Sequence, residues 1–192
     1  VGAAAWTLNL GGGALMLGFL GGFALAMVNT FSKTVKPAMA IAYAGFQGLA
    51  LGTISHMYNT VYDGIVSQAI LVTISAFAGM LFAFKSGRIR VTPKFTKVLM
   101  TALIGYLVLG LVSFISSLVT GTSIYNVGGF GLIIATGGMV LAAFFLILDF
   151  DSIQKGIAAG APESESWRAA FGLMVTIVGL YLEVLRVLSI LR

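Results

Sequence analysis

Two acidic residues stand within apolar sequence in the last third of the chain. Asp149 ends one long apolar run, and Glu183 lies inside another. A carboxylate in such surroundings is costly, so it requires a proton, a partner or a cation. If the two side chains meet, they titrate as a unit, because two neighbouring carboxylates cannot both ionise cheaply. Once deprotonated, such a pair offers oxygen ligands to calcium, but only transiently, because calcium prefers six to eight oxygens.

Each acid also has a plainer structural explanation. Arg186 lies three residues after Glu183, so the two side chains can pair along one face of a helix. Asp149 can be a charge at a helix end, and Asp151 can form a solvated pair with Lys155, four residues on. In a plain hairpin, Glu183 lies deeper than Asp149, and a direct contact requires tilt or an irregular turn. The sequence leaves these alternatives open.

The remaining polar residues predict no catalytic site. Intramembrane aspartyl proteases also use two membrane acids, but the surroundings of Asp149 and Glu183 lack the Gly-x-Gly-Asp and Pro-Ala-Leu patterns of that class. The sequence contains no cysteine and one histidine, His56, which we predict to be a solvated loop residue beside Asp63. It contains no phosphate-binding loop, dinucleotide motif or metal-binding spacing. We therefore expect a protein that is not an enzyme and that holds no cofactor apart from transient calcium.

The elements that carry these residues are predicted to be membrane helices. Of the 192 residues, 59% are hydrophobic and 9% are charged, whereas about a quarter are charged in a soluble domain. About 20 apolar residues suffice to span a membrane. Runs of this kind cover 14–28, 37–55, 64–84, 98–119, 127–148 and 167–191.

Before the first of these runs, residues 1–8 are also apolar, and Gly11-Gly12-Gly13 follows as a predicted turn. We interpret 1–8 as the end of a further helix whose beginning is missing. The expected fold is therefore all-α: a polytopic membrane bundle of seven transmembrane helices, the first truncated, in a single integral membrane domain over 1–192.

Basic residues occur in alternate loops. Lys or Arg is present in the loops at 29–36, 85–97 and 151–168, and absent from those at 56–63 and 120–126. The positive-inside rule predicts that the basic loops face the cytoplasm of the inner (plasma) membrane. By this count the C-terminus lies outside, whereas Arg186 and Arg192 favour a tilted or re-entrant last segment. No basic arm suggests nucleic acid, so the expected surroundings are the lipid bilayer.

Small residues are spaced as close helix packing requires. Gly18 and Gly22 form one small-xxx-small pair, and Gly48 and Gly52 form another. Gln47 stands beside the second pair. We expect it to make an interhelical hydrogen bond, with a pore contact as the alternative.

At these residues the chain resembles the Bax inhibitor, or transmembrane BAX inhibitor motif, family, in its bacterial YccA-type, actinobacterial-like branch. The resemblance rests on Ile-Leu-Asp-Phe-Asp-Ser-Ile at 147–153, Leu-Tyr-Leu-Glu-Val-Leu-Arg at 180–186, Tyr-Ala-Gly-Phe-Gln-Gly-Leu-Ala-Leu-Gly at 43–52 and Gly-Arg-Ile-Arg-Val-Thr-Pro-Lys-Phe at 87–95. It implies a seven-helix bundle with the last helix central. It also places Glu183 and Gln47 at positions where the family pattern carries Asp and an acid, respectively.

The resemblance further implies a pH-sensitive calcium leak channel gated by an acidic pair on the sixth and seventh helices. That pair maps onto Asp149 and Glu183, which would bind calcium transiently. The YccA-type members imply an alternative, a non-conducting membrane partner that modulates a protease or a larger assembly. In that alternative the two acids form a structural latch.

Overall fold

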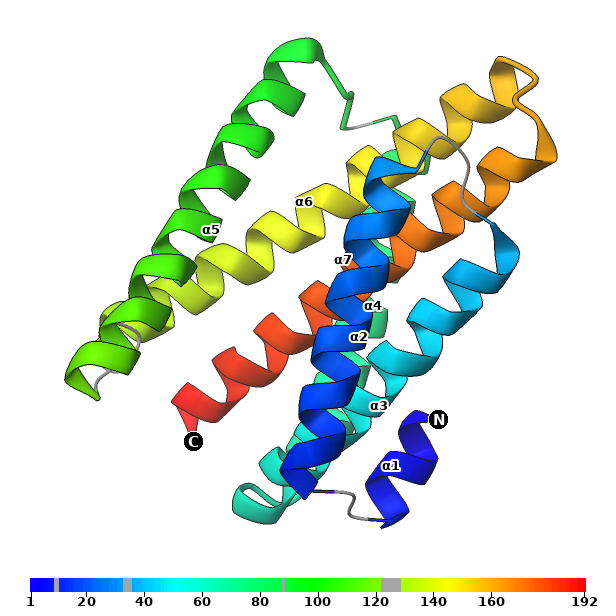
Figure 1. The fold of residues 1–192 in the computed structure, drawn as a ribbon. Helices are drawn as coiled ribbons and strands as arrows, with labels where there is room; N and C mark the ends of the chain where they lie inside the picture. The colour runs from blue at the N-terminus through cyan, green and yellow to red at the C-terminus, as the bar shows by residue number, and fades with distance from the viewer. Residues whose placement is uncertain (9–10, 33–35, 88, 122–128) are drawn as a thin grey trace. The chain divides into compact units, whose positions relative to one another are not determined.

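Seven α-helices make up the secondary structure of the described residues in a computed structural model (Figure 1). The structure describes residues 1–8, 11–32, 36–87, 89–121 and 129–192, and these contain no strand. The helices are α1 (Gly2–Leu8), α2 (Gly11–Phe31), α3 (Pro37–Val61), α4 (Ile65–Lys85), α5 (Pro93–Thr120), α6 (Phe130–Ala158) and α7 (Glu163–Leu191).

All of these helices except α1 are long and apolar enough to cross a membrane, which gives six candidate spans in the described part of the chain. The fold is therefore the all-α, polytopic helical architecture expected from the sequence. Parts of two predicted loops, 33–35 and 122–126, lie outside the described residues, as does Arg88 of the basic segment.

The first helices extend beyond their predicted ends. α2 begins at Gly11, so the turn predicted at Gly11-Gly12-Gly13 is wrong. α3 continues to Val61, so most of the loop predicted over 56–63 is helical, His56 included, and the connection to α4 is limited to residues 62–64. Backbone polar groups near lipid must find partners within their own segment, and a longer helix provides them.

α5 likewise begins five residues before its apolar run. The Thr92 side chain accepts a hydrogen bond of 3.1 Å from the backbone N–H of Phe95, and Pro93 occupies the first turn. A side-chain cap and an N-terminal proline both favour a helix start, because the first N–H groups have no partner in the helix. At the other end, Gly121 adopts φ 70°, a left-handed conformation suited to a helix C-cap.

The largest correction concerns the segment between the two acids. The linker predicted over 151–168 is mostly helical, because α6 continues to Ala158 and α7 begins at Glu163. The short connection turns at Gly160, with φ 63°. α6 and α7 have 29 residues each, or about 43 Å at 1.5 Å per residue. That exceeds a hydrocarbon layer of about 30 Å, so the charged ends of these helices can be helical outside it.

The helices form two compact units, one of residues 1–66 with 153–174 and the other of residues 67–152 with 175–192. The single domain expected over 1–192 stays a prediction. In the first unit, Ala40, Tyr43 and Phe171 form a buried core, on which Leu25, Ala26, Trp167 and Met174 pack. The rings of Tyr43 and Phe171 meet edge to face at 4.9 Å, which joins α3 to the start of α7.

Glycines allow the helices of this unit to approach closely. A Cβ at Gly18 of α2 would lie 2.6 Å from the backbone nitrogen of Ala50 and 2.8 Å from the carbonyl oxygen of Phe46, both on α3. A Cβ at Gly52 of α3 would collide with the backbone of Gly2 on α1. The predicted packing role of these glycines is therefore confirmed, because only the missing side chain allows such backbone contacts.

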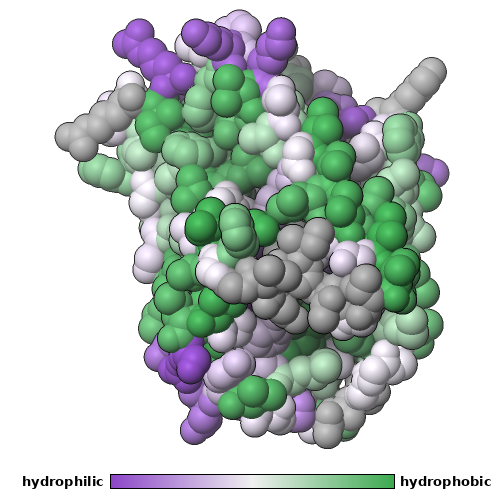
Figure 2. Space-filling model, turned by 90° about the vertical axis from the view of Figure 1, so that its left-hand side faces the viewer, coloured by the Kyte–Doolittle hydropathy of each residue, from purple (hydrophilic) through white to green (hydrophobic). Residues whose placement is uncertain are grey.

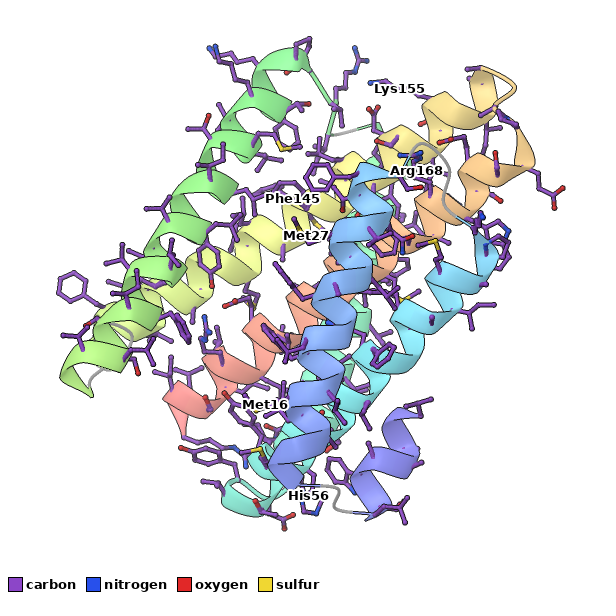
Figure 3. The ribbon with its side chains drawn as sticks, viewed as in Figure 1. Met16, Met27, His56, Phe145, Lys155 and Arg168 are labelled. Atoms are coloured by element: carbon purple, nitrogen blue, oxygen red, sulfur yellow. The ribbon has the colours of Figure 1, made fainter. Side chains whose placement is uncertain are left out.

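Polar and aromatic contacts also join segments of the first unit, and Figure 3 labels two of the residues that make them, His56 and Arg168. Arg168 of α7 donates a hydrogen bond of 3.2 Å to the backbone oxygen of Ser32 and pairs with Glu165 at 3.0 Å. His56 lies edge to face with Trp6 of α1, at 5.7 Å between ring centroids. The environment of His56 is therefore a helix-to-helix aromatic contact and not the solvated loop expected.

In the second unit, aromatic contacts join α6 to its neighbours. Phe150 lies 5.5 Å from Phe77 of α4, between ring centroids, and Phe144 lies 6.0 Å from Phe95 of α5. The fully buried side chains include Leu146, Ile147, Leu180, Val184 and Leu185, all on α6 and α7. The stretches of α6 and α7 around the two acids are thus surrounded by apolar side chains.

The outer faces of the helices are apolar as well. Exposed large side chains on α5 include Val98, Ile104, Leu107, Leu111, Phe114 and Leu118. Hydrophobic residues cover much of the face drawn in Figure 2. An apolar surface this extensive marks contact with lipid, because a soluble protein rarely exposes such patches to water.

Candidate functional site

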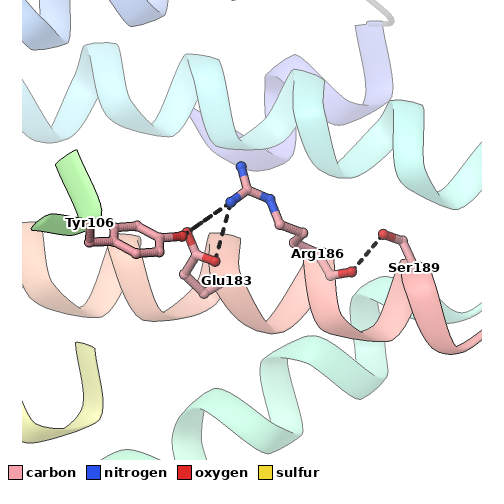
Figure 4. A network of polar contacts seen from close by, with 4 residues as sticks. All are labelled: Tyr106, Glu183, Arg186 and Ser189. Carbon is pink, nitrogen blue, oxygen red and sulfur yellow. Dashed lines mark hydrogen bonds and ion pairs between the residues drawn. The ribbon is translucent and has the colours of Figure 1, made fainter. Parts of the chain in front are cut away.

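Glu183 lies at the centre of a polar cluster that joins α5 to α7 (Figure 4). The Tyr106 hydroxyl donates a hydrogen bond of 2.6 Å to Glu183 Oε1. Arg186 Nη1 lies 3.4 Å from each carboxylate oxygen and donates to the Tyr106 hydroxyl at 3.2 Å. The Glu183 side chain is 14% exposed and that of Arg186 is 36% exposed. Glu183 is therefore largely buried and is paired with both a cation and a hydroxyl.

This cluster confirms one of the alternatives that the sequence left open. Glu183 and Arg186 pair along one helix face, as their spacing of three residues allows. Sequence reasoning missed Tyr106, which lies 77 residues from Glu183. The available signal was a tyrosine, with its polar hydroxyl, inside an otherwise apolar run. A buried tyrosine hydroxyl usually finds a hydrogen-bond partner.

Asp149 lies in a different polar environment. Its carboxyl group is hydrogen-bonded to the side chain of Thr176 on α7. Its second oxygen, Oδ2, is buried and has no hydrogen-bond partner among the described residues. Leaving a polar group buried without a partner costs about 1–3 kcal/mol, and more when the group is charged. A proton or a cation at Asp149 Oδ2 would therefore stabilise this buried group.

The two acids belong to separate clusters. Thr176, the partner of Asp149, and Glu183 lie about two turns apart on α7, roughly 10 Å along its axis. The contacts of the described side chains include no hydrogen bond between the two carboxyls. Glu183 lies further along the hairpin than Asp149, as expected for a plain antiparallel pair. The assignment of Asp149 and Glu183 as a gating pair stays a prediction.

The other predicted polar positions contribute differently. Gln47 points its side-chain oxygen towards α2, since a Cβ at Gly22 would lie 2.7 Å from it. Its interhelical hydrogen bond stays a prediction, as does the pairing of Asp151 with Lys155 near the end of α6. Asn29 of α2, which sequence reasoning did not select, is 1% exposed, and its amide has no hydrogen-bond partner among the described residues.

The donor set limits what these groups can bind. The part of the chain that the structure describes holds no group of three or more His, Cys, Asp or Glu side chains suited to a metal ion. Asp149 and Thr176 offer a carboxylate and a hydroxyl, far fewer than the six to eight oxygens that calcium prefers.

Comparison with known proteins places these features in a family. The chain matches no curated protein and no solved structure. A family model described as Bax inhibitor 1 like matches residues 1–192, which is the whole chain. The bacterial YccA-type branch stays a prediction. Because the match covers all of the spanning helices and both acidic clusters, this multi-pass membrane protein belongs to the Bax inhibitor 1 like family.

Proposed function

We propose that this chain is a pH-sensitive cation leak, with calcium as the expected ion and Asp149 as the residue that the ion meets. The observation that carries the proposal is the buried Oδ2 of Asp149, which has no hydrogen-bond partner among the described residues. Ionisable groups inside a membrane protein are expensive and mark ion or proton pathways. The proposed activity is transport without catalysis.

Competition between protons and calcium supplies the pH dependence. The ionised Asp149 carboxylate attracts a cation, whereas the protonated form offers no charge. Calcium and a proton therefore compete for the same oxygens, and flux is expected to rise with pH. The described side chains known to meet at the site are one carboxylate and one hydroxyl, so calcium is held weakly and is released again.

Glu183 is the second acid of the proposed gate. Tyr106 and Arg186 hold its carboxylate about two turns along α7 from Thr176, the partner of Asp149. A direct exchange of one proton between the acids is not needed. A shift of α7 changes the surroundings of both acids together, because the same helix carries Thr176 and Glu183.

The orientation follows from charge. The basic loops lie on the cytoplasmic side of the plasma membrane in the proposed orientation, and the neutral loops lie on the other side. The partners are then the lipid bilayer and transient calcium, with no nucleic acid.

The test is calcium flux into liposomes that contain the purified protein, measured across a pH series. Asp149→Asn keeps the shape and the hydrogen bond from Thr176 but removes the charge. We expect it to lower flux about tenfold, equivalent to about 1.4 kcal/mol of lost cation stabilisation, and to flatten the pH dependence. Asp151→Asn, two residues further on the same helix, is the matched control and is expected to behave like the unaltered protein.

Two outcomes would contradict the proposal. Unchanged flux and pH dependence in Asp149→Asn would remove Asp149 from the ion path. No flux at any pH, together with a stoichiometric membrane protein recovered in a pull-down, would favour the non-conducting alternative, in which the acids only hold helices together.

A further inference from the structure

Tyr106, which is hydrogen-bonded to Glu183, packs against a glycine of a third helix, α6. Gly138 of α6 is buried, and a Cβ there would lie 2.6 Å from the Tyr106 hydroxyl oxygen and 2.7 Å from its Cζ. Such distances are too short for a real side chain. The end of the Tyr106 ring therefore occupies the space that the missing side chain leaves.

We propose that Tyr106 is a positioning residue for Glu183, and that Gly138 of α6 is required to admit its hydroxyl. We call Tyr106, Gly138, Glu183 and Arg186 the tyrosine clamp. Tyr106 on α5 donates the hydrogen bond, Gly138 on α6 leaves room for the tyrosine ring, and Glu183 and Arg186 lie on α7. A change in the register or distance between α5 and α7 breaks the two hydrogen bonds of Tyr106, to Glu183 at 2.6 Å and from Arg186 at 3.2 Å, because both cross between these helices. The contact of Glu183 with Arg186 lies within α7 and is not affected directly.

The clamp determines what the Glu183 carboxylate can do. With Tyr106 in place, Oε1 accepts from the hydroxyl and both oxygens lie near Arg186. Without the hydroxyl, Arg186 is the one residue drawn in Figure 4 that still donates to the Glu183 carboxylate. Glu183 then gains freedom to move away from α5. In the gate proposed above, this freedom corresponds to the open state, and that part of the inference rests on the proposed function.

The chain is well suited to a direct spectroscopic test. It has only six Asp and Glu side chains, so the infrared carboxylate band of Glu183 can be identified as the band that Glu183→Gln removes. Tyr106→Phe deletes only the hydroxyl and is expected to shift this band, because the short hydrogen bond to Oε1 is lost. Gly138→Ala is expected to shift it in the same direction by displacing the hydroxyl.

Gly137→Ala is the matched control. It makes the same change one residue away on α6, where a Cβ would meet nothing within 4 Å. We expect no band shift from it. The combined variant Tyr106→Phe with Gly138→Ala is expected to give the same band as Tyr106→Phe alone, because the alanine acts only through the hydroxyl. A general loosening of the packing would instead add to the effect.

Flux forms the second arm of the experiment. At a fixed pH, Tyr106→Phe and Gly138→Ala are each expected to raise calcium flux about tenfold, the low end of what a hydrogen bond to a charged group is worth. Gly137→Ala should leave flux unchanged. If the Glu183 band does not shift in Tyr106→Phe, the tyrosine clamp is wrong. It is also wrong if Gly137→Ala shifts the band as much as Gly138→Ala does. A shifted band with no flux in any variant would support the clamp and contradict the proposed channel. If Tyr106→Phe shifts the band but leaves flux unchanged, the hydrogen bond positions Glu183 without controlling ion flux, and the link to the open state is wrong.

Discussion

Gly18→Val is expected to separate α2 from α3 and to lower the melting temperature of the detergent-solubilised protein by about 6 °C or more. Even the first atom of a side chain at this position would meet the backbone of α3 at 2.6 Å, so no flexible group can move aside. Overpacking typically costs about 1–3 kcal/mol, and occasionally more, and a contact with backbone belongs at the upper end of this range. Each kcal/mol lowers the melting temperature by about 2–4 °C for a protein of this size, so a cost of about 3 kcal/mol lowers it by about 6 °C or more.

Gly79→Val provides the matched control for this prediction. It makes the same substitution on α4, where a Cβ would meet nothing within 4 Å. Glycine and valine differ little in helix propensity, so its melting temperature should stay within about 2 °C of the unaltered protein. Equal melting temperatures for the two variants would show that α2 and α3 do not pack through Gly18.

Arg186→Met is expected to destabilise the protein by about 2 kcal/mol. This value lies between those of exposed and buried ion pairs, because Glu183 is 14% exposed and Arg186 is 36% exposed. Methionine is an unbranched apolar side chain that fills much of the space of the arginine stem. The substitution removes the only cation that pairs with Glu183 in the described structure. Among the described residues, the Glu183 carboxylate, 14% exposed, would keep the Tyr106 hydroxyl as its one hydrogen-bond donor. Thermal melting in detergent measures the loss.

A second substitution separates lost charge pairing from lost packing. Adding Glu183→Gln to Arg186→Met is expected to restore much of the stability, because no uncompensated charge remains. Arg192→Met is the control, since this exposed arginine contacts Gln68 at 3.0 Å, and its effect should be below about 1 kcal/mol. If the double variant is no more stable than Arg186→Met, the pairing account of this cluster is wrong.

Hydropathy alone predicted the spanning helices, because each span depends on about 20 neighbouring residues and on nothing further away. The helix ends were less predictable. Charge and polarity predict loops at His56 and over 151–168, whereas His56 is helical and 151–168 is mostly helical. Charged residues are compatible with a helix wherever it extends beyond the hydrocarbon, as α6 and α7 do with 29 residues each.

The candidate site shows the same division. Pairing of Glu183 with Arg186 was predictable, because residues three apart on a helix share a face. The spacing of the glycines predicts that helices pack closely at them, but it does not predict which backbone atoms of the neighbouring helix they contact. Tyr106 and Thr176 were not predicted, because each reaches its acid from another helix and only the register between helices brings them together.

The amino-acid sequence by itself determined that this chain is a helical membrane protein, which segments are apolar enough to span, and that Asp149 and Glu183 are acids in apolar surroundings that need partners. Composition and local periodicity are sufficient for these conclusions, because lipid imposes them on each segment separately. The tertiary structure decided which partners each acid has. It gives Thr176 to Asp149, and Tyr106 with Arg186 to Glu183. It does so because side chains from different helices meet only where packing sets their relative depth, as the space above Gly138 illustrates.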